Sequence, residues 1–142
     1  MSALIKQRTP HDCVICSLAM LTGRSYEDVV AAIGDVFDPE RGVRYEQKAL
    51  ERLGFSCRFE NGEPAGDFVS LHRAYAFSPQ FFRSLAWGRR ALVSVPSLNY
   101  PDGSHMIYWD GIAVLDPSDK KTYQRFDELL PEELVLFRET RP

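Results

Sequence analysis

The sequence has no excess of basic residues and no long apolar run. Among 142 residues, 17 are lysine or arginine and 20 are aspartate or glutamate, giving a formal net charge of −3 at pH 7. Binding to phosphate backbones needs a positive field that this balance does not supply. No stretch approaches the roughly 20 apolar residues that cross a bilayer, and the N-terminus lacks a signal-peptide core. We therefore expect no nucleic-acid partner, no membrane partner and a cytoplasmic location.

Cysteine is also scarce, with three in the chain. An odd number without an export signal argues against a disulfide framework and favours reduced thiols. Cys13 and Cys16 form a Cys-x-x-Cys pair, but a redox pair of that kind follows a strand of a βαβ unit, which the pattern does not predict here. Zinc needs four ligands, and this pair with His11 has no second pair to complete the set. We expect no metal and no cofactor.

The remaining composition is that of one globular domain, residues 1–142, with 44% hydrophobic and 12% aromatic residues. Apolar periodicity and stop signals predict an α+β fold, with helices in the first half and a twisted antiparallel sheet in the second. Asp12 and Ser25 are the expected N-caps of the first two helices. The predicted helices cover 12–22, 26–33, 43–54 and 78–86, and the predicted strands cover 55–60, 90–98, 105–110, 112–116 and 134–139.

Cys13 is predicted to open the first helix, where unpaired backbone N–H groups and the helix dipole favour a thiolate. A nucleophilic thiolate needs a base and a group that orients the base. His105 begins one predicted strand and Asp116 ends the next. A two-residue Asp110-Gly111 turn would pair 108 with 113 and therefore place His105 opposite Asp116. We expect Asp116 to hold the ring through its Nδ1–H, as the third member of a triad.

Gln7 precedes the same helix, and its side-chain amide N–H could lie beside the backbone N–H of Cys13. Two such donors would form an oxyanion hole for a tetrahedral intermediate. The other reading of Cys13 is a buried, apolar, structural cysteine. The order Gln7, Cys13, His105, Asp116 favours catalysis, because the four residue types together supply a donor, a nucleophile, a base and an orienting group.

These residues, with "SLAMLTGRSYEDV" after Cys13 and with "SHMIYWDG" and "LDPS" later, resemble papain-like cysteine peptidases. The resemblance is to the bacteriocin-processing, double-glycine leader peptidases and their free-standing relatives, over roughly residues 5–35 and 90–120. It implies a papain-like fold, with Cys13 as nucleophile, His105 as general base, Asp116 as orienting residue and Gln7 as oxyanion donor. The sequence departs from the family at Val14, where a small residue is usual. It also contains no transporter segment, so leader specificity is not implied.

The sequence thus predicts a cysteine-dependent hydrolase that cleaves an amide or isopeptide bond of a peptide or protein. It does not indicate an oligomeric state, and a monomer is assumed. Two alternatives stay open. A catalytically silent relative would keep the groove and bind peptides without turnover, and a deamidase or acyltransferase effector would use the same triad.

Overall fold

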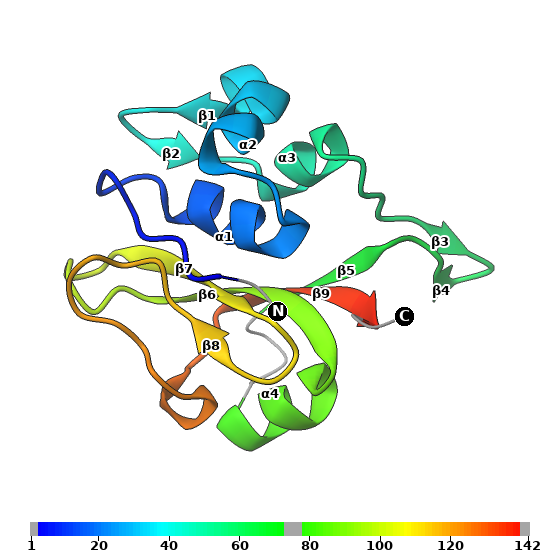
Figure 1. Ribbon diagram of the computed structural model, residues 1–142. Helices are drawn as coiled ribbons and strands as arrows, with labels where there is room; N and C mark the ends of the chain where they lie inside the picture. The colour runs from blue at the N-terminus through cyan, green and yellow to red at the C-terminus, as the bar shows by residue number, and fades with distance from the viewer. Residues whose placement is uncertain (1–2, 73–77, 140–142) are drawn as a thin grey trace.

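The computed structural model describes residues 3–72 and 78–139, which form a five-stranded antiparallel sheet with helices on both faces (Figure 1). The helices are α1 (Cys13–Thr22), α2 (Tyr26–Ile33), α3 (Glu46–Arg52) and α4 (Pro79–Ala86), with 3-10 turns η1 (Gly34–Val36) and η3 (Phe126–Glu128). The strands are β1 (Phe37–Asp38), β2 (Gly42–Val43), β3 (Phe59–Glu60), β4 (Glu63–Pro64), β5 (Phe68–His72), β6 (Arg89–Pro96), β7 (Ser104–Trp109), β8 (Val114–Leu115) and β9 (Glu133–Glu139).

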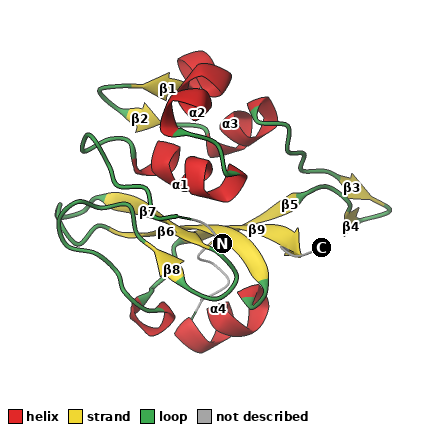
Figure 2. Cartoon of the chain, viewed as in Figure 1, coloured by secondary structure: helices red, strands yellow, loops and turns green. Residues whose placement is uncertain are grey.

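The large sheet has the order β5-β9-β6-β7-β8, and each neighbouring pair is antiparallel. Because successive side chains of a strand point to opposite faces of the sheet, each strand contributes residues to the two hydrophobic cores on those faces. Met106 and Tyr108 of β7 join the core beneath α1, α2 and α3, whereas Ile107 and Trp109 join the core beneath α4. The same three N-terminal helices lie together on one side of the sheet and α4 on the other (Figure 2). The expected α+β class with an antiparallel sheet is confirmed.

Helix α1 is buried on nearly every side, as its apolar composition predicts. It ends at Gly23, whose φ of 73° is left-handed and suits glycine. Ser25 caps α2 by accepting a hydrogen bond from the Asp28 N–H, as expected. Asp12 occupies the N-cap position of α1, but its side chain makes no capping hydrogen bond. The prediction of an Asp12 cap is therefore wrong in its chemistry, because that carboxylate is bound elsewhere.

Three elements differ from the sequence prediction. The third helix begins at Glu46 and not at Val43, because Val43 pairs with Phe37 in the β1–β2 hairpin. Only Phe59 and Glu60 of the segment 55–60 form a strand, so Cys57 precedes it. The strand β5 was not predicted at all, although it pairs with β9 along its whole length.

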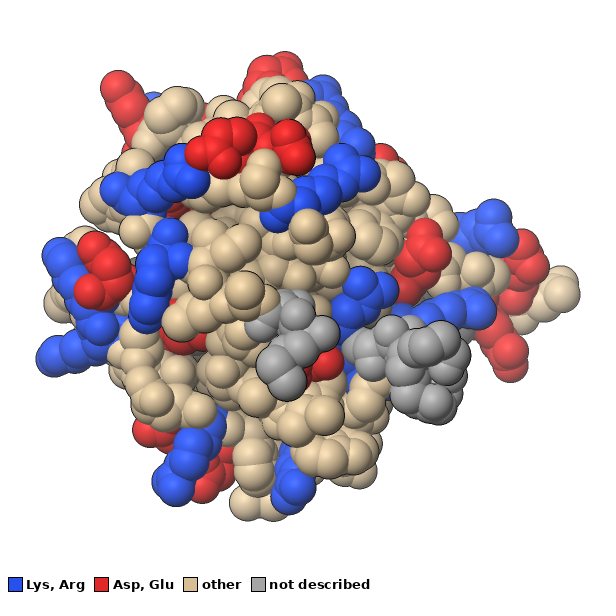
Figure 3. Space-filling model, in the orientation of Figure 1, with Lys and Arg blue, Asp and Glu red and all other residues tan. Residues whose placement is uncertain are grey.

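Lysine, arginine, aspartate and glutamate are intermixed over the face drawn in Figure 3, with no extended area of one sign. Among residues 3–72 and 78–139, no helix combines the length and apolar character that crossing a bilayer requires.

Candidate functional site

Cys13 is the first residue of α1 and is partly exposed. The loop before it is anchored by Asp12, whose Oδ2 accepts hydrogen bonds from the Arg8 N–H at 3.0 Å and the Tyr26 hydroxyl at 2.7 Å. On its other side, β2 approaches this loop so closely that a Cβ on Gly42 would lie 2.6 Å from the His11 carbonyl oxygen. The thiol is thus carried by a backbone that is fixed on two sides.

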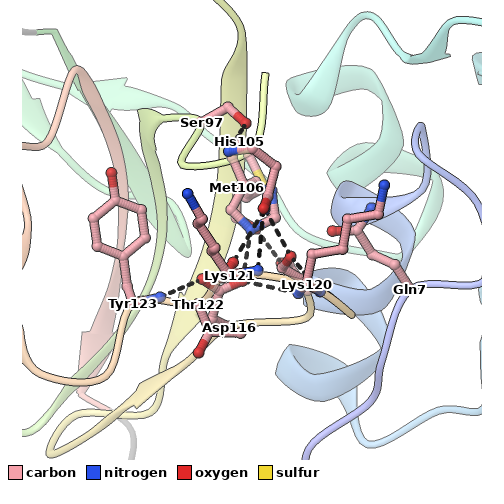
Figure 4. Close-up of polar contacts among 12 residues, drawn as sticks. Gln7, Ser97, His105, Met106, Asp116, Lys120, Lys121, Thr122 and Tyr123 are labelled. Carbon is pink, nitrogen blue, oxygen red and sulfur yellow. Dashed lines mark hydrogen bonds and ion pairs between the residues drawn. The ribbon is translucent and has the colours of Figure 1, made fainter. Parts of the chain in front are cut away.

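His105 and Asp116 form a hydrogen-bonded pair, with 2.6 Å between His105 Nε2 and Asp116 Oδ1. The two side chains are only 11% and 2% exposed, so water screens them little. Backbone N–H groups hold the carboxylate in place: Ser118 donates to Oδ1 at 2.9 Å and Tyr123 to Oδ2 at 2.7 Å. Figure 4 shows the imidazole and the carboxylate pointing toward one another, with the Tyr123 N–H on the far side. The orientation of the ring is therefore fixed.

The contact does not come from the register expected for β7 and β8. Tyr108 pairs with Leu115 and not with residue 113, so the register is displaced by two residues. The connection is a wider loop, in which Asp110 Oδ1 accepts hydrogen bonds from the Ile112 and Ala113 N–H groups. Asp116 lies just beyond the end of β8. It reaches His105 diagonally, and it does so through Nε2 where Nδ1 was expected.

The Cys13 thiol lies close enough to the His105 ring to affect its protonation, and both residues line the same cavity. Burial alone would lower the pKa of His105, but the hydrogen bond with Asp116 and the interaction with Cys13 raise it to about 9. Burial likewise acts to raise the pKa of Asp116, yet hydrogen bonds from His105 and two backbone N–H groups hold it below its usual range. The pair therefore favours an imidazolium beside an ionised carboxylate at neutral pH.

Gln7 lies in the segment that runs alongside the loop after Asp116. Its backbone N–H donates to the Pro117 carbonyl at 2.7 Å, and Lys6 Nζ donates to the Ser118 carbonyl at 2.9 Å. The side-chain amide of Gln7 donates to the Thr9 carbonyl at 2.9 Å. The structure thus brings Gln7 into the neighbourhood of the pair, as Figure 4 shows, while its amide is bound within its own loop.

A cavity of about 200 Å³ opens beside the thiol. Cys13 and His105 line one end, and its walls come from α1, the β1–β2 hairpin, α3 and the sheet. Val14, which follows the cysteine, also lines it, but this side chain is buried in the core beneath the helices. Cys13 thus faces a cavity and is not enclosed in the core.

Sequence reasoning missed the roles of four residues that shape this site, including Asp12, which was expected only as a helix N-cap. Asp12 and Tyr26 anchor the loop before the thiol, and the backbones of Ser118 and Tyr123 fix the carboxylate. For Asp12 and Tyr26, the available signal was an aspartate directly before a strongly apolar helix. The other two act through backbone N–H groups, which leave no mark in a sequence.

Cys13, Cys16 and Cys57 are all free thiols. Cys16 is fully buried, and this burial raises the pKa of its thiol to about 12, so it stays protonated. Within the described ranges, no three His, Cys, Asp or Glu side chains are gathered to hold a metal ion. Comparison of the sequence with protein-family models and with curated proteins found no match.

Proposed function

We propose that the protein is a papain-like cysteine hydrolase that cleaves an amide or isopeptide bond in a peptide or protein. The observation that carries this proposal is the imidazole of His105, which is hydrogen-bonded to Asp116 and lines the same cavity as the Cys13 thiol. A nucleophile at a helix start, a base and an orienting carboxylate are the parts that acyl transfer requires. The cavity beside the thiol would admit the substrate.

In the first step, the Cys13 thiolate attacks the carbonyl carbon. A C–S bond forms, and the π electrons move to the carbonyl oxygen. When this oxyanion collapses, the C–N bond breaks and the His105 imidazolium gives its proton to the leaving nitrogen. The first N–H groups of a helix have no acceptor within the helix, so the Cys13 N–H is available to the oxyanion.

In the second step, water attacks the thioester while neutral His105 takes its proton. The C–S bond breaks, a carboxylic acid leaves and the thiolate is restored. Asp116 stays ionised throughout and holds the ring. For Gln7 to serve as the second oxyanion donor, the amide N–H that does not bond to the Thr9 carbonyl must face the oxyanion when substrate binds.

A catalytically silent, peptide-binding module is the second candidate. The engagement of the Gln7 amide by Thr9 favours it, because the Thr9 carbonyl already uses one of the two N–H groups that could serve an oxyanion hole. A deamidase or acyltransferase would share the first step and differ in the acceptor of the thioester.

The test combines a peptide-like epoxide with a substrate screen. The protein is incubated with E-64, the adduct is located by peptide mapping, and a library of internally quenched peptides is assayed with wild type, Cys13→Ala and His105→Ala. We expect the adduct on Cys13 and peptide cleavage by wild type alone. An adduct on Cys13 without cleavage would favour the binding module, and no adduct on Cys13 would refute the proposal.

A further inference from the structure

The cavity beside the thiol has a neighbouring cavity that shares part of its lining. This second cavity, also of about 200 Å³, lies next to it and is lined by residues of β5. The two share Glu46 of α3, Ser94 of β6 and Met106 of β7 as lining residues. Together they form a groove that begins at Cys13 and ends near His72, and we call it the sheet groove.

The floor of the sheet groove is a row of residues across four strands. Met106 pairs with Ser94, Ser94 pairs with Glu133, and Glu133 pairs with His72. All four are on the face that α1 and α3 cover, since they alternate with residues of the opposite core. An extended peptide lying on this row would cross the strands and pass under α3.

Charge changes along the sheet groove. Arg41 and His11 line only the end beside the thiol, whereas Glu133 and His72 line only the far end. Glu133 lies 3.6 Å from the His72 ring, and both side chains are more than half exposed, so this pair is weak. Glu46 stands between the two ends, where both cavities meet.

Glu46 is a partly buried carboxylate that forms no ion pair with any described residue, although Arg41 and His105 line the same cavity. No described residue forms an ion pair or a side-chain hydrogen bond with it. Burial raises the pKa of Glu46, a hydrogen bond from its own backbone N–H acts against this, and the nearby negative charge of Glu133 adds to the rise. A partly buried carboxylate gains most from a cationic partner that enters with its own hydrogen-bond donors.

We propose that the sheet groove binds a lysine or arginine side chain of the substrate, with Glu46 and Glu133 recognising its charge. This inference rests on the proposed function, because it names the substrate class of the same site: peptides that carry a basic residue close to the cleaved bond. The side chain would lie over Ser94 and beneath the first turn of α3.

The experiment is a positional scan of internally quenched peptides in which one position at a time carries lysine, norleucine or glutamate. At one position we expect kcat/KM for lysine to exceed that for norleucine by about tenfold. Glu46→Gln should remove this preference, and Glu46→Lys should turn it toward glutamate. Glu51→Gln is the matched control, because Glu51 is an exposed residue on α3 that lines neither cavity.

A second measurement does not need turnover. The rates at which Cys13 reacts with a cationic and an anionic methanethiosulfonate are compared in wild type and Glu46→Gln, with Cys57 as the internal reference. The thiolate attacks the reagent's sulfenyl sulfur, a mixed disulfide forms and methanesulfinate leaves. We expect the cation-to-anion rate ratio at Cys13 to fall by about threefold or more in the variant, and the ratio at Cys57 to stay constant.

If the protein cleaves peptides, the peptide scan tests the inference. If it cleaves none, the reagent ratio tests it. A lysine preference that survives in both Glu46 variants would overturn the inference, and so would the lack of any preference. With no turnover, an unchanged reagent ratio would overturn it. Failure of the proposed function is seen separately, as the absence of an E-64 adduct on Cys13.

Discussion

His105 and Asp116 are joined across 2.6 Å, from Nε2 to Oδ1, although the two residues are not opposite one another in the β7–β8 ladder. The carboxylate sits past the end of its strand and is held there by the N–H groups of Ser118 and Tyr123. The imidazole is thereby left with its other nitrogen for Cys13. This relationship determines what substitutions of Asp116 should do.

Asp116→Asn should retain activity within about tenfold of wild type at mildly acidic pH. As the pH rises, the variant should lose activity at a lower pH than the wild-type protein does. The amide oxygen can still accept the hydrogen bond from the ring, but the negative charge that helps to raise the pKa of His105 to about 9 is gone. The imidazolium therefore loses its proton at lower pH, and the alkaline limb moves down. A pH–rate profile on a cleaved peptide measures this.

Asp116→Ala is the companion variant, and it should lose more activity than Asp116→Asn because nothing then orients the ring. Both variants leave the Tyr123 N–H without its carboxylate acceptor, so their folding must be checked by circular dichroism. An unshifted alkaline limb in a folded Asp116→Asn protein would show that the charge does not reach the ring.

Gln7→Ala should lower kcat by about 10²-fold and leave the melting temperature unchanged. The reason is that, among the described residues, its amide bonds to the exposed Thr9 carbonyl in the free protein, and it would contact the oxyanion in the transition state. Gln80→Ala, an exposed change on α4, is the control. Equal kcat values for Gln7→Ala and wild type would mean that Gln7 is a surface residue without a catalytic role.

Tyr26→Phe should destabilise the protein by about 1–3 kcal/mol, because it removes a hydrogen bond from a fully buried carboxylate. Asp12 already has one buried oxygen, Oδ1, without a partner among the described residues, so it cannot compensate easily. Urea unfolding measures the change, with Tyr45→Phe as the exposed control. If the two variants unfold at the same urea concentration, the Asp12–Tyr26 contact is not what anchors the loop.

The helices and the central strands were predictable because local signals agree with the fold. Gly23 ends α1 and Ser25 starts α2, as the sequence indicates. The hairpin between β7 and β8 was also expected, but its register was not. An Asp-Gly pair usually makes a two-residue turn, whereas here the Asp110 side chain closes a longer loop.

The sheet groove and the anchors of the site were not predictable. Glu46 is one acidic residue among 20 aspartates and glutamates until the fold places it where two cavities meet. The strand β5 was missed because Ser70 and His72 interrupt its apolar residues. Two-residue strands such as β1 and β2 have no periodicity to read. All of these depend on contacts between segments far apart in the sequence.

The central claim is that His105 and the start of α1 make Cys13 a nucleophile. The direct measurement is the rate of iodoacetamide alkylation of each thiol at pH 6, followed by peptide mapping, in wild type and His105→Ala. Cys57 is the reference, since it is partly exposed like Cys13, and Cys16 is buried. The account predicts that Cys13 reacts at least about tenfold faster than Cys57, and that His105→Ala removes this advantage. Equal rates for Cys13 and Cys57 in the wild-type protein would contradict it.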